Sequence, residues 1–329
     1  MRIAPALLAI VALVLAGCGS SNSSPSSAPP PSSGNALAAG GQNHVHSILV
    51  VPGNKNDLYM GTHYHLYHSL DGGQRWSPLL SQMVLSLAVD PLQPRTLYAV
   101  SLQSGLLKST DAGAHWSVLK GVGGKGTVSG VVVAPATRTI LAYGTGIYRS
   151  TDGGVSWSHV LAGQSLAGVA AGGGTIYAAT PNGLFTSKDG GGSWHFVKAV
   201  GNQPAIQVAA AKSYAYVVTP IQLFRTMDGG THWTAVGAAP QGIEFLGISA
   251  SQPTELFAEV AGTGYWVTRD GGAHWSHANA GITDHNFSAS TIRVAPQAPN
   301  LVYTGSWGVH FYRSQDAGRH WARVATLTH

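Results

Sequence analysis

The sequence predicts an all-β fold, a seven-bladed β-propeller of four-stranded antiparallel blades. Three observations support this prediction. One short motif recurs seven times along the 329 residues, and the chain contains 43 Gly and 17 Pro, a composition typical of many turns. The segments between the copies alternate apolar and polar residues, as half-buried strands do. Self-similarity at a fixed period indicates a repeat architecture rather than a fold with a single unrepeated core.

The motif has the form Ser/Thr-x-Asp-x-Gly-x-x-Trp, and every copy matches at all four positions. Successive copies lie 37 to 46 residues apart, which is about the length of one four-stranded propeller blade. Seven such units fill the chain from residue 43 to residue 329, so we expect one folded domain there. The aspartates of the seven copies are Asp71, Asp111, Asp152, Asp189, Asp228, Asp270 and Asp316.

The residue types of the motif indicate a rigid hairpin, which we call the repeated turn. An aspartate carboxylate accepts hydrogen bonds from the backbone of its own turn, and a glycine two positions later permits positive φ. The tryptophan starts the next strand and buries a large ring beside the turn. We therefore expect all seven aspartates to be structural, so that replacing Asp152 destabilises the fold rather than removing an activity.

Seven such motifs in register resemble the Asp-box, or BNR, repeats of sialidases, sortilin-type receptors, xyloglucanases and photosystem II assembly factors. The resemblance covers residues 43–329. A sialidase would imply six blades, a three-arginine clamp and a Tyr-Glu nucleophile pair, and the usual Arg-Ile-Pro marker is absent here. A single seven-bladed domain behind an export signal is similar to the assembly factors. No family activity carries over residue by residue.

The strand order predicts how the ring closes and where a site lies. The first predicted strand is 44–51 and the last is 321–327, so each blade uses consecutive strands and closure depends on packing of blade 7 against blade 1. The repeated turns lie on one face. On the opposite face, the first strand of each blade begins and its second strand ends. The longer connections between strands also lie on that face. We expect a protein or glycan ligand on that opposite face.

Residues 1–17 have the pattern of an export signal, because one arginine precedes an apolar run too short to cross a bilayer. The end of that run, Leu15-Ala16-Gly17-Cys18, resembles the lipobox of bacterial lipoproteins, in which the cysteine is lipidated. Residues 18–42 are then a lipidated Cys18 and a Ser/Pro-rich tether. The sequence predicts an extracytoplasmic protein held at a bacterial cell membrane through lipid on Cys18.

Charge and cysteine content exclude other classes. Only 9% of residues are Asp, Glu, Lys or Arg, against roughly 25% in an ordinary soluble domain. The formal net charge of +5 is thinly spread, so we expect no nucleic-acid partner. The single cysteine excludes an intramolecular disulfide. We expect the chain to be a monomer.

Blade 1 differs from the others in its histidines. His44 and His46 begin its first predicted strand, and His63 and His65 end its second. Antiparallel pairing brings these strand ends together, and the twofold period of a strand points each pair to one side. His285, in the loop entering blade 7, could approach them. Neutral imidazoles so placed suit zinc or copper. The alternative is that they are ordinary strand-end residues. No other cofactor is indicated.

Few carboxylates remain for catalysis outside the repeated turns. Of the 13 acidic residues, only Glu244, Glu259 and Asp284 are expected on the face opposite the turns. Glu244 and Glu259 start the first strand and end the second strand of blade 6, so an exo-acting glycoside hydrolase using this pair is one reading. The alternative is that these two carboxylates are solvated residues at the rim of the ring and have no catalytic role. The scarcity of carboxylates and arginines favours a non-enzymatic binding or assembly-scaffold protein.

Overall fold

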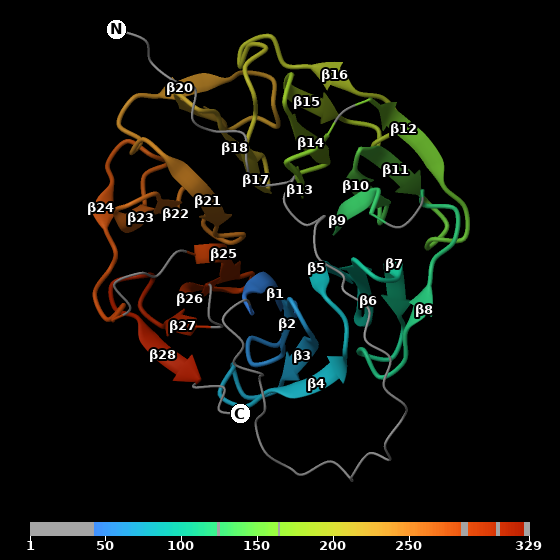
Figure 1. Ribbon diagram of the computed structural model, residues 1–329. Coiled ribbons are helices and arrows are strands. Elements are labelled where there is room, and N and C mark those ends of the chain that lie inside the picture. Colours follow the sequence, from blue (N-terminus) through green and yellow to red (C-terminus); the bar gives the residue numbers. More distant parts are fainter. Residues whose placement is uncertain (1–42, 124–125, 164, 284–288, 307–309, 326–329) are drawn as a thin grey trace, which may run out of the picture. The chain divides into compact units, whose positions relative to one another are not determined.

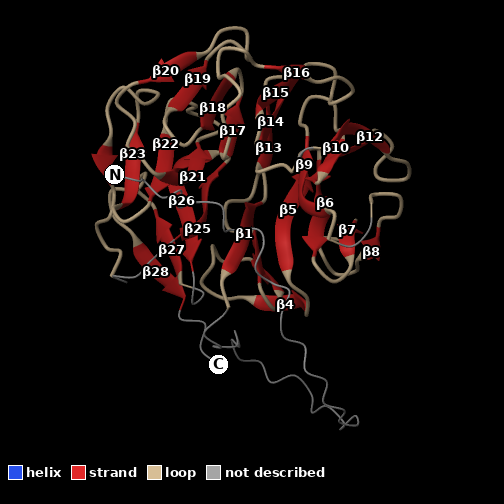
Figure 2. Cartoon of the chain, turned by 45° about the horizontal axis from the view of Figure 1, so that its top comes forward, coloured by secondary structure: helices blue, strands red, loops and turns tan. Residues whose placement is uncertain are grey.

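The computed structural model describes residues 43–123, 126–163, 165–283, 289–306 and 310–325. They form seven sheets, each of four antiparallel strands, arranged as blades around a common centre (Figure 1). The described residues contain strands, turns and bends but no helix (Figure 2). Consequently the described part of the chain has no helical segment long and apolar enough to span a membrane. The predicted fold class is confirmed.

Each blade takes four consecutive strands, so the strands fall into four sets of seven by their position in the blade. The first strands are β1 Val45–Val50, β5 Val84–Asp90, β9 Val128–Val133, β13 Gly168–Gly172, β17 Gln207–Ala211, β21 Ile243–Ile248 and β25 Ala289–Ala295. The second strands are β2 Leu58–Thr62, β6 Gln93–Ser101, β10 Ile140–Gly144, β14 Thr175–Thr180, β18 Tyr214–Val218, β22 Leu256–Val260 and β26 Ala298–Ser306. The third strands are β3 Leu66–Ser69, β7 Gly105–Ser109, β11 Gly146–Ser150, β15 Gly183–Ser187, β19 Leu223–Thr226, β23 Gly264–Thr268 and β27 Phe311–Ser314. The fourth strands are β4 Ser77–Leu80, β8 Ser117–Val118, β12 Ser158–Ala162, β16 His195–Phe196, β20 Thr234–Val236, β24 Ser276–His277 and β28 Ala322–Ala325.

The first strands are innermost, and neighbouring ones contact each other all the way round the ring (Figure 1). β25 packs against β1 and closes it. Blade 1 is complete in β1–β4 and blade 7 in β25–β28, so no strand is exchanged between the two ends. This arrangement confirms the expectation that closure depends on packing between blades.

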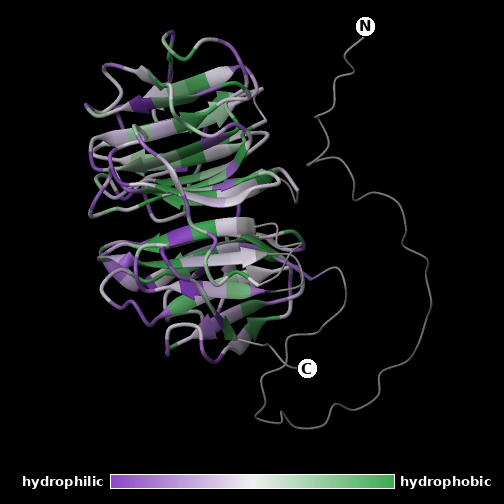
Figure 3. Ribbon diagram, turned by 90° about the vertical axis from the view of Figure 1, so that its left-hand side faces the viewer, coloured by the Kyte–Doolittle hydropathy of each residue, from purple (hydrophilic) through white to green (hydrophobic). Residues whose placement is uncertain are grey.

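Seven apolar layers hold the ring together, one between each pair of neighbouring blades. Hydrophobic residues are concentrated in the stacked strands, and many hydrophilic ones lie in the connections (Figure 3). At the closure, Trp76 meets Phe311 edge-on with ring centroids 5.3 Å apart, and Tyr67 and Tyr303 are buried beside them. Fully burying such side chains contributes about 1.5–3 kcal/mol each, so the layers supply the stability that a disulfide could have given.

The repeated turn has the hydrogen bonds that its residue types predict, as the copy in blade 3 illustrates. Asp152 Oδ1 accepts from the backbone amides of Val155 and Ser156, both at 3.0 Å. Ser150 Oγ donates to Asp152 Oδ1 and accepts from the Gly154 amide, both at 2.8 Å. Gly154 has φ of 94°, and a Cβ there would lie 2.8 Å from Leu119. The hydroxyl-to-aspartate bond recurs in all seven copies.

Each repeated turn also joins its blade to the preceding one. The carbonyl oxygen of the residue after the aspartate accepts a hydrogen bond from the neighbouring blade at all seven interfaces. The donors are long or hydroxyl-bearing side chains whose identity varies. The seven bonds, in ring order, run from Tyr59 to Ala112, Lys108 to Gly153, Arg149 to Gly190, Thr175 to Gly229, Arg225 to Gly271, Arg269 to Ala317 and Arg313 to Gly72.

Candidate metal centre

The innermost strands have an extra residue near their start, on the face opposite the repeated turns. In five blades the register with the second strand shifts by one there. Such a bulge re-aims a side chain, and bulges are frequent next to functional sites. The side chains at this position differ in chemistry from blade to blade. The five bulge residues are His46, Leu85, Ser129, Glu244 and Ser290.

In blade 1 the bulge brings His46 into contact with two other imidazoles. The ring centroids of His44 and His46 are 4.1 Å apart, and that of His63 lies 5.4 Å from His44 and 5.9 Å from His46. The backbone holds the arrangement, because the His63 amide donates to the His44 carbonyl at 3.2 Å. One ring nitrogen from each residue lies within 4.8 Å of the others. We call these three residues the imidazole trio.

The environment of the trio lowers the pKa of two of its imidazoles and so favours their neutral form. Burial lowers the pKa of His46 from 6.5 to about 3, and repulsion from His44 and His63 adds to the shift. Burial also lowers the pKa of His63. Neutral imidazole has the lone pair that a metal requires. Near neutral pH, protons therefore compete only weakly with a metal for the ring nitrogens of His46 and His63.

Two ring nitrogens of the trio lack hydrogen-bond partners. His46 Nε2 and His63 Nδ1 are inaccessible to solvent and bond to nothing in the described structure. An unsatisfied buried polar atom costs about 1–3 kcal/mol and is uncommon in folded proteins. Around zinc, ligand nitrogens at about 2.0–2.1 Å from the metal lie roughly 3.3 Å from one another. The nitrogens of the trio lie within 4.8 Å of one another, so the rings would have to move closer together to share one zinc ion.

The other predicted ligands do not join the trio. His65 lies two residues beyond His63, across a turn in which the Thr62 amide donates to the His65 carbonyl at 2.8 Å. Its ring lies against Tyr67, with centroids 5.3 Å apart, because this turn ends the alternation on which the prediction depended. The expected convergence of four imidazoles thus holds for three. His285 lies outside the described residues.

The predicted catalytic residues lie on different parts of blade 6. Glu244 is the exposed bulge residue of β21, whereas Glu259 on β22 is 3% exposed. Register places Glu259 opposite Phe245 and Tyr265 rather than Glu244. Asp284 lies outside the described residues, as do Cys18 and the 18–42 tether. The predicted pair therefore combines one solvated and one buried carboxylate.

The turn face also has five histidines, within or next to the repeated turns. Four of them each bring Nδ1 to within 2.6–2.7 Å of their own turn's aspartate Oδ2, and their side chains are 78–90% exposed. The four are His115, His232, His274 and His320. His68 is different: it is half-buried, stacks on Tyr59 at 4.3 Å and contacts Asp57 at 2.8 Å. A stacking aromatic on the adjacent strand was the signal that this histidine packs inward.

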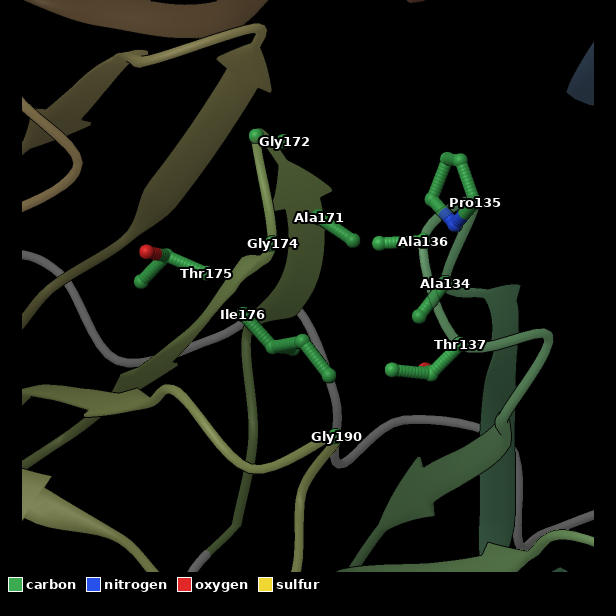
Figure 4. Close-up of a pocket in the computed structure, with 11 residues that line it drawn as sticks. Ala134, Pro135, Ala136, Thr137, Ala171, Gly172, Gly174, Thr175, Ile176 and Gly190 are labelled. Carbon is green, nitrogen blue, oxygen red and sulfur yellow. The ribbon is translucent and has the colours of Figure 1, made fainter.

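Two cavities lie on the turn face, between neighbouring blades. One of about 320 Å³ is lined by residues 134–137, 171–176 and 190, and Figure 4 shows Ala136 and Ala171 facing each other across it. The other, of about 350 Å³, lies at the closure, beside residues 53–56 and 295–298. None of the predicted site residues lines either cavity. The three residues of the trio are partly buried and lie on the opposite face.

Comparisons with known proteins place the fold but not a family. No protein-family model and no curated protein matches the sequence. Among solved structures, a GH74 xyloglucanase from Xanthomonas campestris is similar, with a TM-score of 0.70 and 17% identity over 88% of this chain and 55% of that one. This chain therefore spans about half the length of the enzyme.

Two further structures are similar over most of this chain. YCF48 bound to D1 peptide has a TM-score of 0.64 and 15% identity, over 83% of this chain and 92% of that one. The extracellular domain of a one-component system from B. thetaiotaomicron has a TM-score of 0.64 and 13% identity, over 85% of this chain and 39% of that one. At these identities the likeness concerns the fold alone, and glycoside hydrolase and non-enzymatic proteins share it.

Proposed function

We propose that this chain is a non-enzymatic, extracytoplasmic binding or assembly propeller that holds zinc or copper at the imidazole trio. The observation that carries the proposal is the convergence of three ring nitrogens within 4.8 Å. Two of the three residues also have buried nitrogens without partners. Three imidazoles leave one position of a tetrahedral metal open. A bound metal would therefore present that position to a ligand on the face opposite the repeated turns.

The partner on that face is a protein or a glycan, and lipid on Cys18 would hold the chain at a membrane. YCF48 in complex with D1 peptide supports a binding role for this kind of ring, and the xyloglucanase supports glycan recognition. The hydrolase reading receives less support from the site. An acid and nucleophile pair needs two carboxylates facing one substrate, whereas Glu244 is exposed and Glu259 is buried.

Metal titration of the purified domain tests the proposal. Elemental analysis comes first, followed by zinc and copper titrations of the wild type and of a variant carrying His46→Ala and His63→Ala. We expect one saturable site at pH 7.5 that the double variant loses. Circular dichroism should show the same strand content in both, because the repeated turns lie on the other face.

His195→Ala provides the matched control, since His195 is an exposed histidine on the outermost strand β16. This variant should bind like the wild type. Absence of saturable uptake by the wild type would contradict the proposal. Equal uptake by wild type and double variant would assign the binding to exposed histidines instead.

A further inference from the structure

The cavity at the closure of the ring, which we call the closure cavity, is lined differently from the other cavity on the turn face. Both lie between neighbouring blades, at the turns that join first to second strands, and their volumes are about 350 and 320 Å³. The lining of the cavity between blades 3 and 4 is Ala, Gly, Pro, Thr and Ile, without a charged or amide side chain. The lining of the closure cavity includes Asn54, Lys55, Asn56 and Gln297. Of the two, the closure cavity is the one with side chains that can recognise a polar ligand.

At two other joints, a cationic side chain from the corresponding turn is satisfied by the neighbouring blade. Arg138 Nε of blade 3 donates to Asp90 Oδ2 of blade 2 at 3.1 Å. Lys212 Nζ of blade 5 donates to the Ser251 carbonyl of blade 6 at 2.8 Å. At the closure the cation is Lys55, whose side chain makes no ion pair or hydrogen bond within the part of the chain that the structure describes. Its ammonium group is therefore available to a ligand.

The nearest acidic residue along the chain is directed away from the closure cavity. Asp57 Oδ1 lies 2.8 Å from His68 Nε2, and the His68 ring stacks on Tyr59 with centroids 4.3 Å apart. Tyr59 belongs to the apolar layer between blades 1 and 2, so Asp57 is on the side of blade 2 rather than blade 7. The residues that line the closure cavity include no acidic one. A ligand there meets one positive charge and no negative charge.

The amide side chains of the closure cavity present further donors. Gln297 reaches from blade 7 to blade 1, where its Oε1 accepts from the Gly53 amide at 2.5 Å. Asn54 Oδ1 accepts from the Asn56 amide at 3.2 Å. Because a backbone N–H can bond only to the oxygen of a side-chain amide, the NH₂ groups of Gln297 and Asn54 remain to donate elsewhere. Together with the Lys55 ammonium, they suit a ligand that is rich in acceptors.

The base of the closure cavity is apolar. Val50 and Val51 are each 5% exposed and Ala295 is 1% exposed, whereas the four polar residues of the lining are exposed and form the mouth. The lining therefore favours a ligand that combines hydrocarbon surface, several oxygen acceptors and one negative charge. A volume of about 350 Å³ lies at the small end of the roughly 300–1,000 Å³ of small-molecule sites, so it suits a single ring.

We propose that the closure cavity binds a hexuronate, a monosaccharide with one carboxylate. The carboxylate lies at Lys55, the hydroxyls accept from the amides of Asn54 and Gln297, and the C–H face of the sugar ring packs on the apolar base. Inorganic phosphate suits the site less well, because its charged oxygens would face one ammonium group and hydrocarbon. A neutral hexose makes no use of the charge. The site lies on the turn face, so it is separate from the imidazole trio and goes beyond the function proposed above.

Calorimetric titration of the purified protein in EDTA tests the proposal with D-glucuronate, D-glucose and inorganic phosphate. We expect saturable binding of glucuronate and at least tenfold weaker binding of glucose and of phosphate. Lys55→Met should weaken glucuronate binding at least tenfold, and Gln297→Leu should weaken it less. Lys188→Met is the matched control and should bind like the wild type, because Lys188 is an exposed lysine in the repeated turn of blade 4.

Three results would overturn the proposal: no saturable glucuronate binding, equal affinity for glucose or phosphate, or unchanged binding by Lys55→Met. Thermal unfolding supplies a second readout, because a ligand held between blades 1 and 7 binds only the closed ring. Glucuronate should raise the Tm of the wild type, and an equal rise in Lys55→Met would count against the site. The variant with His46→Ala and His63→Ala should bind glucuronate like the wild type. Loss of binding by that variant would place the ligand at the trio instead.

Discussion

The two faces of the ring differ in how closely the blades repeat. On the turn face, all seven blades place the same hydroxyl, carboxylate and carbonyl groups in the same hydrogen bonds. On the opposite face, the bulge position holds imidazole, hydrocarbon, hydroxyl or carboxylate depending on the blade. Groups that every blade needs serve stability. A side chain that occurs in only one blade, such as His46, is not part of the repeated hydrogen bonding and can take part in binding.

If the opposite face binds metal through buried imidazoles, its affinity should resist acid. At pH 5, an imidazole with an unperturbed pKa of 6.5 is neutral about 3% of the time, so three such ligands would cost roughly 30-fold each. Burial lowers the pKa of His46 to about 3 and that of His63 as well. The affinity lost between pH 7.5 and pH 5 should therefore stay below roughly 1,000-fold in metal titrations.

Solvent-exposed imidazoles with a pKa of about 6.5 would release the metal near that pH, so burial moves the expected release to more acid pH. A lowered histidine pKa keeps the ligand neutral further into the acid range, so the metal is released at a lower pH. A loss of roughly 10⁴-fold or more by pH 5 would indicate three solvent-like imidazoles. That outcome would mean that the metal binds elsewhere.

On the turn face, a single hydroxyl should matter for stability and not for binding. Ser150 is 1% exposed, and Ser150→Ala removes the acceptor of the buried Gly154 amide. Leaving that amide unpaired costs about 1–3 kcal/mol of unfolding free energy. Urea denaturation measures the loss, and metal affinity should not change. Ser158→Ala, at an exposed position in the same blade, is the control and should shift stability by less than about 0.5 kcal/mol.

Acid should destabilise the turn face through its aspartates. Burial alone would raise the pKa of Asp316, but hydrogen bonds from His320 and Ser314 lower it to about 2. A carboxylate whose pKa is lower in the folded state contributes stability above its unfolded value of about 3.9 and loses that contribution as the pH falls toward 2. Urea midpoints should therefore fall from pH 4 to pH 2. Asp316→Asn should flatten part of this dependence, and a wild-type midpoint constant over this range would contradict the assignment.

The smallest effect is expected from the blade 6 carboxylates. Because Glu244 is exposed and Glu259 is buried, we expect no turnover of a fluorogenic glycoside panel by the wild type. The variants Glu244→Gln and Glu259→Gln should then leave metal binding unchanged. Turnover by the wild type that both variants lose would establish the hydrolase reading instead.

The fold could be predicted because a whole motif repeats. Seven aspartates in register specify seven hairpins, and the spacing leaves room for four strands between them. The site was harder to predict, because it depends on local departures from strand geometry. The bulge at His46 and the turn at Thr62 decide which imidazoles meet, and neither has a sequence signature. Sequence reasoning therefore identified the trio but added His65.

Other features depend on long-range packing, which no local pattern encodes. The ring of Tyr143 can lie over the neighbouring strand only because its partner there is Gly130, where a Cβ would lie 2.1 Å from the ring.

Anomalous diffraction from crystals grown with zinc or copper tests the central claim most directly. Data recorded above and below the metal absorption edge locate the ion without reference to any mutant. The account predicts one strong peak about 2.0–2.1 Å from a ring nitrogen of each of His44, His46 and His63. Peaks only beside the exposed histidines of the turn face, with the trio empty in those crystals, would contradict it.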